Sequence, residues 1–167
     1  MRSITRNFVW LVVGLLVLQA AQTLAEDEIP APLPDFQLSK VDGTTVSSKQ
    51  LTSQKKWLLI FTLADCPGCD TLLRVINKNE NPDLPVHVVV VVGGAVPAKV
   101  QDMSKKFPDL LEAAWYADPS KTGVSQLKLR GLPAVVGMQQ DMIMWSTMGI
   151  LSGDTVKMKS ILVSWCK

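Results

Sequence analysis

The sequence contains few of the residues that hold metals or staple small secreted domains. Among 167 residues there are three cysteines, Cys66, Cys69 and Cys166, and a single histidine, His87. A structural zinc site needs about four such ligands. It would therefore take every cysteine and the histidine, and a histidine within a strand has little reach, so we predict no metal site. The chain is also long enough to bury a core without a disulfide framework. His87 lies within an apolar segment, and we interpret it as an ordinary strand residue.

The chain also lacks a large excess of positive or negative charge. Lys and Arg total 17 and Asp and Glu total 15, which gives a formal net charge of +2. Nucleic acid is not expected as a partner, because binding it needs a strongly basic surface. With 47% hydrophobic residues, no polar low-complexity tract and no internal repeat, the chain is neither disordered nor a solenoid. A single globular domain is the remaining class.

The N-terminal segment has the pattern of a secretory signal peptide. Two arginines precede the apolar run 8–18, and small residues follow it up to Ala25. This run has 11 residues, whereas a membrane-spanning helix needs about 20, so an uncleaved anchor is the less favoured alternative. We predict that residues 1–25 are removed and that residues 26–167 form one periplasmic domain, with 15 basic and 15 acidic side chains.

Apolar runs of strand length alternate with helical patterns in the rest of the chain. Strands are expected at 57–63, 86–92, 113–117, 132–138 and 143–148, and helices at 66–78, 97–107, 120–129 and from 154 onward. Asp42-Gly43 predicts the turn of a hairpin between 36–38 and 44–46. Three prolines, at 30, 32 and 34, predict an extended leader outside any sheet. The alternation predicts an α/β or α+β sandwich.

Cys66 and Cys69 form a Cys-x-x-Cys motif with Pro67 and Gly68 between them. The motif follows a predicted buried strand and begins a predicted helix, and its spacing puts both sulfurs on one turn. The N–H groups and the partial positive charge of a helix N-terminus stabilise a thiolate. We therefore predict that Cys66 is the nucleophile, that Cys69 is the resolving thiol, and that no tightly bound cofactor is needed.

The order of strand, Cys-x-x-Cys, helix, strand and helix, followed by Gly131-Leu132-Pro133 opening a strand, resembles the thioredoxin superfamily. The resemblance implies an α/β thioredoxin fold, with a central mixed sheet flanked by helices and an N-terminal β-hairpin extension. It also implies that Pro133 is a cis-proline packed beside the cysteines. Leu132, before it, would face the substrate.

Further segments match one branch of that superfamily. They are 33–38, Asp42-Gly43, 56–61, Asp118-Pro119 and 129–134. These segments resemble the TlpA-like exported thiol-disulfide oxidoreductases and the accessory thioredoxins of methylamine dehydrogenase maturation. The resemblance implies dithiol chemistry on protein or small thiol and disulfide substrates. If the protein is a reductase, it also implies a membrane electron donor.

The motif departs from that branch near the cysteines. Asp65 replaces a frequent Trp, and Ile60 replaces a polar or acidic residue that helps to move the proton of the resolving thiol. Asp65 and Asp70 place negative charge beside the cysteines, which disfavours a thiolate. We therefore expect a reductant or weak isomerase rather than a strong oxidant. The alternative is a non-catalytic copper-handling or assembly chaperone that uses the same two cysteines as soft ligands.

The third cysteine and the methionines give weaker signals. Cys166 flanks the apolar stripe of the last predicted helix, and we interpret it as a partly buried structural thiol. The alternative is an intermolecular disulfide or a third redox thiol. Met142, Met144 and Met148 lie at even spacing, so we expect them to share one strand face and to pack in the core.

Overall fold

The computed structural model describes residues 29–51, 55–76, 87–110, 113–149 and 155–166. Its strands are β1 (Ala31–Pro32), β2 (Gln37–Lys40), β3 (Thr45–Ser47), β4 (Lys56–Leu63), β5 (His87–Gly93), β6 (Ala114–Asp118), β7 (Ala134–Gln139) and β8 (Met142–Met148). Its helices are α2 (Pro67–Ile76), α3 (Pro97–Lys105), α4 (Thr122–Gln126) and α5 (Thr155–Cys166), with short 3₁₀ turns at Ser48–Gln50 and Pro108–Leu110. The predicted signal peptide, its cleavage site and Asp154, where the last predicted helix begins, lie outside the described residues.

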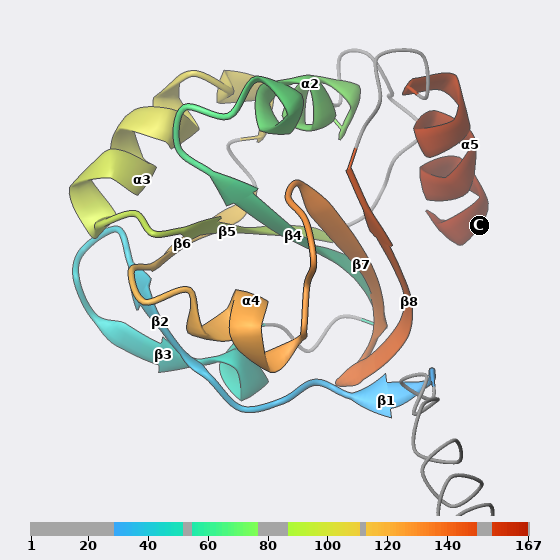
Figure 1. The fold of residues 1–167 in the computed structure, drawn as a ribbon, viewed down its shortest axis with the longest axis horizontal. Coiled ribbons are helices and arrows are strands. Elements are labelled where there is room, and N and C mark those ends of the chain that lie inside the picture. The colour runs from blue at the N-terminus through green and yellow to red at the C-terminus, as the bar shows by residue number, and fades with distance from the viewer. Residues whose placement is uncertain (1–28, 52–54, 77–86, 111–112, 150–154, 167) are drawn as a thin grey trace, which may run out of the picture.

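The strands form one mixed sheet in the order β1-β8-β7-β4-β5-β6-β2-β3 (Figure 1). Strands β4, β5 and β6 are parallel to one another, whereas β7 runs antiparallel to β4, and β8 runs antiparallel to β7. The predicted hairpin is confirmed as β2 and β3, which turn at Gly43 with φ +87° and extend the sheet beyond β6. The structure therefore has the α/β thioredoxin-like architecture with added N-terminal strands.

Strand β4 lies at the centre of the sheet, and its alternating side chains fill two cores. Leu58 and Ile60 face the core that is covered by α2, α3 and α5. Leu59 and Phe61 face the opposite core, which includes Phe36 and is covered by α4 and the N-terminal strands. A strand that is buried on both faces explains the continuous apolar run in the sequence. This burial fixes the position of the residues that follow β4.

Two predictions, one for the proline-rich leader and one for the helix at 120–129, are wrong. The proline-rich leader was expected outside the sheet, but β1 pairs with β8, where Pro32 lies opposite Met142. Because β1 is an edge strand, a missing N–H does not interrupt the ladder. The helix expected at 120–129 is shorter, since Lys121 and Lys128 adopt left-handed backbones, with φ of 55° and 50°, on either side of α4.

The methionine prediction is also wrong. A register shift pairs Gly137 with Trp145 and Met138 with Ile143, which leaves Met144 as an extra residue in β8. Such a bulge exchanges the faces of the residues on its two sides, so Met142 and Met148 do not share one face. Met148 is 45% exposed, and neither Met142 nor Met144 is part of the buried core.

The stripe predicted on the last helix is largely confirmed. Met158 and Leu162 of α5 are buried against the core that includes α2, and Ile161 and Trp165 are partly buried. The backbone of α5 extends to Cys166. The surroundings of the Cys166 side chain lie outside the described part of the structure, so its interpretation as a structural thiol stays a prediction.

Candidate redox site

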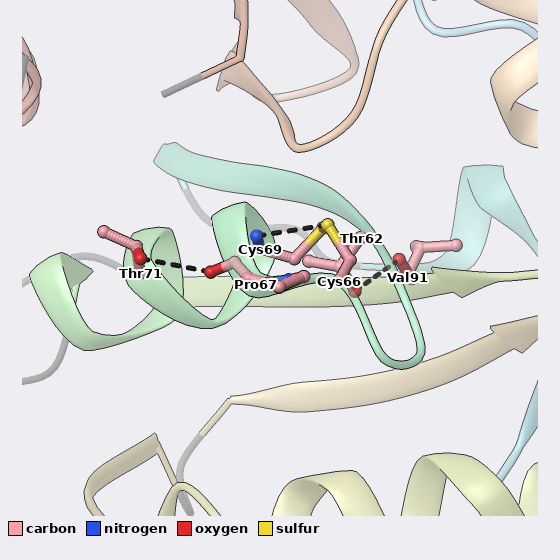
Figure 2. Close-up of a disulfide and its surroundings, with 6 residues drawn as sticks. All are labelled: Thr62, Cys66, Pro67, Cys69, Thr71 and Val91. Carbon is pink, nitrogen blue, oxygen red and sulfur yellow. Dashed lines mark hydrogen bonds between the residues drawn. A yellow bond between two sulfur atoms is a disulfide. The ribbon is translucent and has the colours of Figure 1, made fainter. Parts of the chain in front are cut away.

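The Cys-x-x-Cys motif lies at the carboxyl end of β4, where the chain turns into α2. Cys66 comes just before the first helical residue, Pro67, which is a position that tolerates a missing N–H. Cys66 and Cys69 are joined as a disulfide with their Cα atoms 5.2 Å apart (Figure 2). The spacing in the sequence therefore brings the two sulfurs together as predicted.

The two cysteines have different environments. Cys66 is partly exposed, whereas Cys69, within α2, is 0% exposed. The backbone N–H of Cys69 donates a hydrogen bond to Cys66 Sγ over 3.2 Å, and this donor stabilises negative charge on that sulfur. An external thiolate or disulfide can therefore reach Cys66 more easily than Cys69. This difference supports the predicted roles of nucleophile and resolving thiol.

The segment before β7 lies against the motif. The peptide bond from Leu132 to Pro133 is cis, as predicted, and Pro133 is buried. A Cβ atom added to Gly68 would lie 3.7 Å from Cδ of Pro133, which is ordinary contact distance. Leu132 is partly buried and packs against the core on the α4 side. Two segments more than 60 residues apart in the sequence thus form one site.

His87 does not belong to this site. It is the first residue of β5 and pairs with Trp57, whereas the motif follows Leu63 at the other end of β4. Six residues of strand separate the two ends, which corresponds to about 20 Å. The interpretation of His87 as an ordinary strand residue is consistent with this position. In the described ranges, no three His, Cys, Asp or Glu side chains lie close enough to bind a metal ion.

A buried hydroxyl lies near the end of β4. Ile60, at the position where the branch that the sequence resembles often has a polar or acidic residue, is 0% exposed and part of the core. Thr62, two residues later on the same strand face, is also 0% exposed, and its hydroxyl donates to the carbonyl of Val91 over 3.5 Å (Figure 2). Threonine thus supplies a polar atom to this strand face four residues before Cys66. Thr62 was not among the predicted site residues because it continues an apolar run.

Asp65 has a partner that was not predicted from the sequence. Asp65 has a left-handed backbone with φ +57°, and its carboxylate forms an ion pair with Lys99 of α3, with Nζ to Oδ2 at 3.2 Å. The negative charge that was counted against a thiolate at Cys66 therefore has a cation beside it. The parallel pairing of β4 and β5 is the signal that could have found Lys99, because loops after parallel strands meet at one edge.

A buried carboxylate secures the same edge of the sheet. Asp118, at the end of β6, is 1% exposed, and its two oxygens accept hydrogen bonds from the N–H groups of Thr122 at 2.8 Å and Gly123 at 2.9 Å. Its backbone carbonyl accepts from the N–H of Gly94 at 2.8 Å. Asp118 thereby connects the loops that follow β5 and β6, at the same edge of the sheet as the cysteine motif.

Comparisons with known proteins agree with this geometry. The family model named Redoxin matches residues 29–141. No curated protein matches the sequence. Across the described part of the chain, every helix is too short or too polar to cross a membrane.

Several solved structures share the fold at low sequence identity. A candidate thiol:disulfide interchange protein DsbE from Chlorobium tepidum is 16% identical with a TM-score of 0.62, covering 84% of this chain and 99% of that one. A secreted disulfide oxidoreductase from Mycobacterium tuberculosis, homologous to E. coli DsbE, is 16% identical with a TM-score of 0.57, covering 77% and 95%. BsSco, of the Sco family of cytochrome c oxidase assembly proteins, is 13% identical with a TM-score of 0.59, covering 84% and 96%. Identities this low show a shared fold.

Proposed function

The chain belongs to the redoxin family, and on that premise we propose that it is an exported, TlpA-like thiol-disulfide oxidoreductase whose reactive pair is Cys66 and Cys69. One observation carries the proposal. A disulfide at the start of α2 has one partly exposed sulfur and one buried sulfur, and the cis-proline Pro133 packs beside it. This arrangement lets one sulfur meet the substrate while the other completes the exchange.

The reaction takes place in two exchange steps. In the reductive direction, the Cys66 thiolate attacks a substrate disulfide, so a mixed disulfide forms and the other substrate sulfur leaves as a thiolate. Cys69 then loses its proton and attacks Cys66 Sγ, which closes the Cys66–Cys69 bond and releases the second substrate sulfur. The substrate gains two electrons and two protons, and the protein dithiol loses them.

The substrate is proposed to lie across Leu132. Among the described residues, the peptide groups of Leu132 make no hydrogen bond, whereas the carbonyl of Pro133 accepts from the N–H of Gly149 over 2.7 Å. An extended substrate segment beside Leu132 could therefore hydrogen-bond to its backbone. Met148 is 45% exposed, and its sulfur accepts from the N–H of Arg130, so an apolar surface lies next to this position. Proteins or small molecules that carry a disulfide fit such a surface.

We propose that the protein works as a reductant or weak isomerase. Pro67 and Gly68 offer no charged side chain to stabilise a thiolate at Cys66, and a strong oxidant needs that stabilisation. A membrane dithiol donor would return the pair to its reduced form after each cycle. The N-terminal pattern of residues 1–25 supports export to the periplasm, where such donors are needed.

The alternative function, copper handling, depends on the same two sulfurs and on the likeness to the Sco fold. The two functions are separated by measuring both on one preparation. We expect the protein to catalyse many turnovers of insulin reduction with a small dithiol as the electron source. Absence of turnover, together with tight binding of one Cu(I) per reduced pair, would instead favour the chaperone. A redox potential near roughly −120 mV would contradict the reductant assignment.

A further inference from the structure

We propose that Lys99 is a positioning residue for the redox pair, which holds the Asp65 carboxylate against α3 and thereby keeps its negative charge from destabilising the reduced Cys66. This inference rests on the proposed function, since it concerns the same two sulfurs. It adds a residue from a different helix, 33 positions beyond the nucleophile. It also makes the aspartate before Cys66 part of a charge pair rather than an isolated anion.

Lys99 of α3 and Asp65, the residue before Cys66, form a direct ion pair. Lys99 lies in the first turn of α3 and its Nζ is 3.2 Å from Oδ2 and 3.4 Å from Oδ1 of Asp65. Asp65 adopts φ +57°, a left-handed backbone that is uncommon outside glycine, asparagine and aspartate. A contact that joins this residue to α3 therefore fixes the direction of the carboxylate that adjoins Cys66.

Other charged groups near the motif do not replace Lys99. Asp70 follows Cys69 in α2 and adds negative charge. The side chain of Lys121 lies against Gly94 at the same end of the sheet, because a Cβ on Gly94 would meet Cε of Lys121 at 3.0 Å. Lys121 packs over the β5 loop, whereas Lys99 contacts the residue adjacent to Cys66. Loss of Lys99 would therefore leave Asp65 without its contact.

The sign of the effect follows from simple electrostatics. An uncompensated carboxylate beside Cys66 disfavours the thiolate, so the pKa of the thiol should increase when Lys99 is neutralised. The reduced state then loses stability relative to the disulfide, and the couple becomes more reducing. The side chains of Lys99 and Asp65 are 43% and 75% exposed, so solvent weakens the effect. We expect a change of about two- to fivefold, the range of an exposed ion pair.

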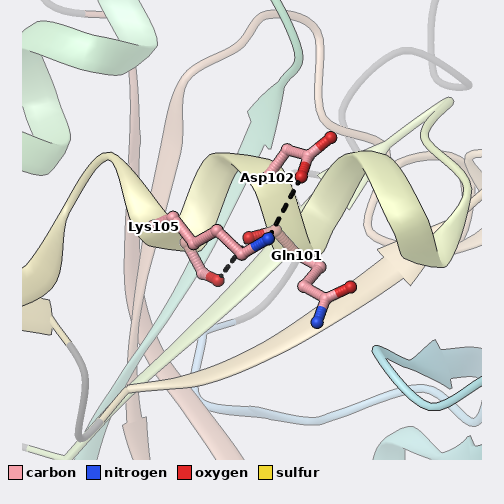
Figure 3. Close-up of polar contacts among 4 residues, drawn as sticks. Gln101, Asp102 and Lys105 are labelled. Carbon is pink, nitrogen blue, oxygen red and sulfur yellow. Dashed lines mark hydrogen bonds and ion pairs between the residues drawn. The ribbon is translucent and has the colours of Figure 1, made fainter.

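The same helix provides a matched control. Lys105 forms an exposed ion pair with Asp102 over 3.5 Å, three residues apart in α3 and within its own helix (Figure 3). Lys105→Gln removes the same charge from the same helix as Lys99→Gln. It touches neither Asp65 nor the cysteine motif. A difference between these variants therefore reports the contact with Asp65 and not the net charge of the protein.

The experiment measures the Cys66–Cys69 couple in Lys99→Gln, Lys99→Arg, Asp65→Asn and the Lys99→Gln/Asp65→Asn double variant. Equilibration with glutathione gives the reduced-to-oxidised ratio, and thiolate absorbance gives the Cys66 titration. In Lys99→Gln we expect the equilibrium to shift about two- to fivefold towards the disulfide and the thiol to titrate at higher pH. Lys99→Arg should restore wild-type values. Asparagine tolerates the left-handed backbone, so Asp65→Asn should fold and shift the equilibrium the opposite way.

The double variant decides whether Lys99 acts through Asp65. If it does, Lys99→Gln has less than half of its effect when Asp65 is already Asn, and about 1 M salt reduces the effect in the wild-type background. Equal glutathione equilibria for wild type, Lys99→Gln and Lys105→Gln would overturn this inference. That result would not contradict the proposed function, which insulin turnover tests. Absence of insulin turnover in the wild type would overturn the proposed function, whereas the glutathione measurement would still test the charge pair.

Discussion

The two ends of strand β4 carry different kinds of residues. At its carboxyl end, beyond Leu63, lie the disulfide, the Asp65–Lys99 ion pair and the buried carboxylate of Asp118. At its amino end, Trp57 donates to a backbone carbonyl, and Lys56 lies 5.1 Å from the centre of the Trp165 ring. The reactive sulfurs and the carboxylates thus lie at one end, and the aromatic packing lies at the other.

Parallel pairing explains this division. The loops after β4 and β5 leave the same edge of the sheet, because Leu63 pairs with Gly93 and Trp57 pairs with His87. Loops at the carboxyl ends of parallel strands converge on one crevice, and functional residues are usually found there. At the opposite end, Trp145 and Trp165 meet edge to face with ring centres 5.8 Å apart, which ties β8 to α5. This division predicts that the redox chemistry and the folding stability can be changed by separate substitutions.

The largest expected effect is on exchange activity. Cys66→Ser should reduce insulin turnover to the uncatalysed background, because the attacking sulfur is lost. Cys69→Ser should trap mixed disulfides with substrates, detectable as adducts that a reductant releases. His87→Gln, at the amino end of the sheet, is the control and should retain wild-type turnover. Turnover near the wild-type rate in Cys66→Ser would show that the reactive end has been misassigned.

The second effect is on folding at the carboxyl end. Asp118→Ala should lower the free energy of unfolding by about 3 kcal/mol, since it leaves the buried N–H of Gly123 and the partly buried N–H of Thr122 without their acceptors. Urea denaturation measures the change. Asp102→Ala, which removes an exposed carboxylate, should change the stability by less than about 0.5 kcal/mol. Equal losses in the two variants would mean that burial of Asp118 has no energetic consequence.

Much of the site could be predicted from local patterns. The buried strand before Cys66, the helix after it and the turn at Asp42-Gly43 each follow from a short stretch of sequence. The position of Pro133 beside the motif came from a family resemblance, because no local rule brings two segments so far apart in sequence together.

Other features depend on contacts that no local pattern contains. The partner of Asp65 is set by the pairing of β4 with β5 and by the position of α3. The faces of the β8 methionines are exchanged by the extra residue Met144. Pro32 enters a strand because β8 offers it a free edge. Each of these outcomes depends on a neighbouring element in space rather than on adjacent residues.

The third expected effect is a loss of stability caused by a substitution near the amino end of β4. A Cβ on Gly137, which pairs with Leu58, would lie 2.1 Å from Nε1 of Trp145, so Gly137→Ala must displace the indole. We expect a loss of about 2 kcal/mol in the free energy of unfolding, typical of overpacking. Gly131→Ala is the matched control, because its Cβ would meet no atom within 4 Å. If Gly137→Ala also changed the Cys66–Cys69 redox potential, the two ends of β4 would be energetically coupled. The redox chemistry and the stability could then not be changed separately.

The smallest expected effect is on the free energy of unfolding at alkaline pH. Burial raises the pKa of Tyr116 in β6 above its ordinary value of 10.0. Once the pH exceeds the pKa of the unfolded chain, the unfolded tyrosine loses its proton while the folded one keeps it, so the folded state becomes less stable as the pH rises. Cysteines in a disulfide do not titrate, so the oxidised protein removes the contribution of Cys66 and Cys69. We expect the free energy of unfolding to decrease less between pH 9 and pH 11 in Tyr116→Phe than in the wild type, measured by urea denaturation of both oxidised proteins. An identical decrease in the two proteins would assign the alkaline loss to other groups, such as the lysines.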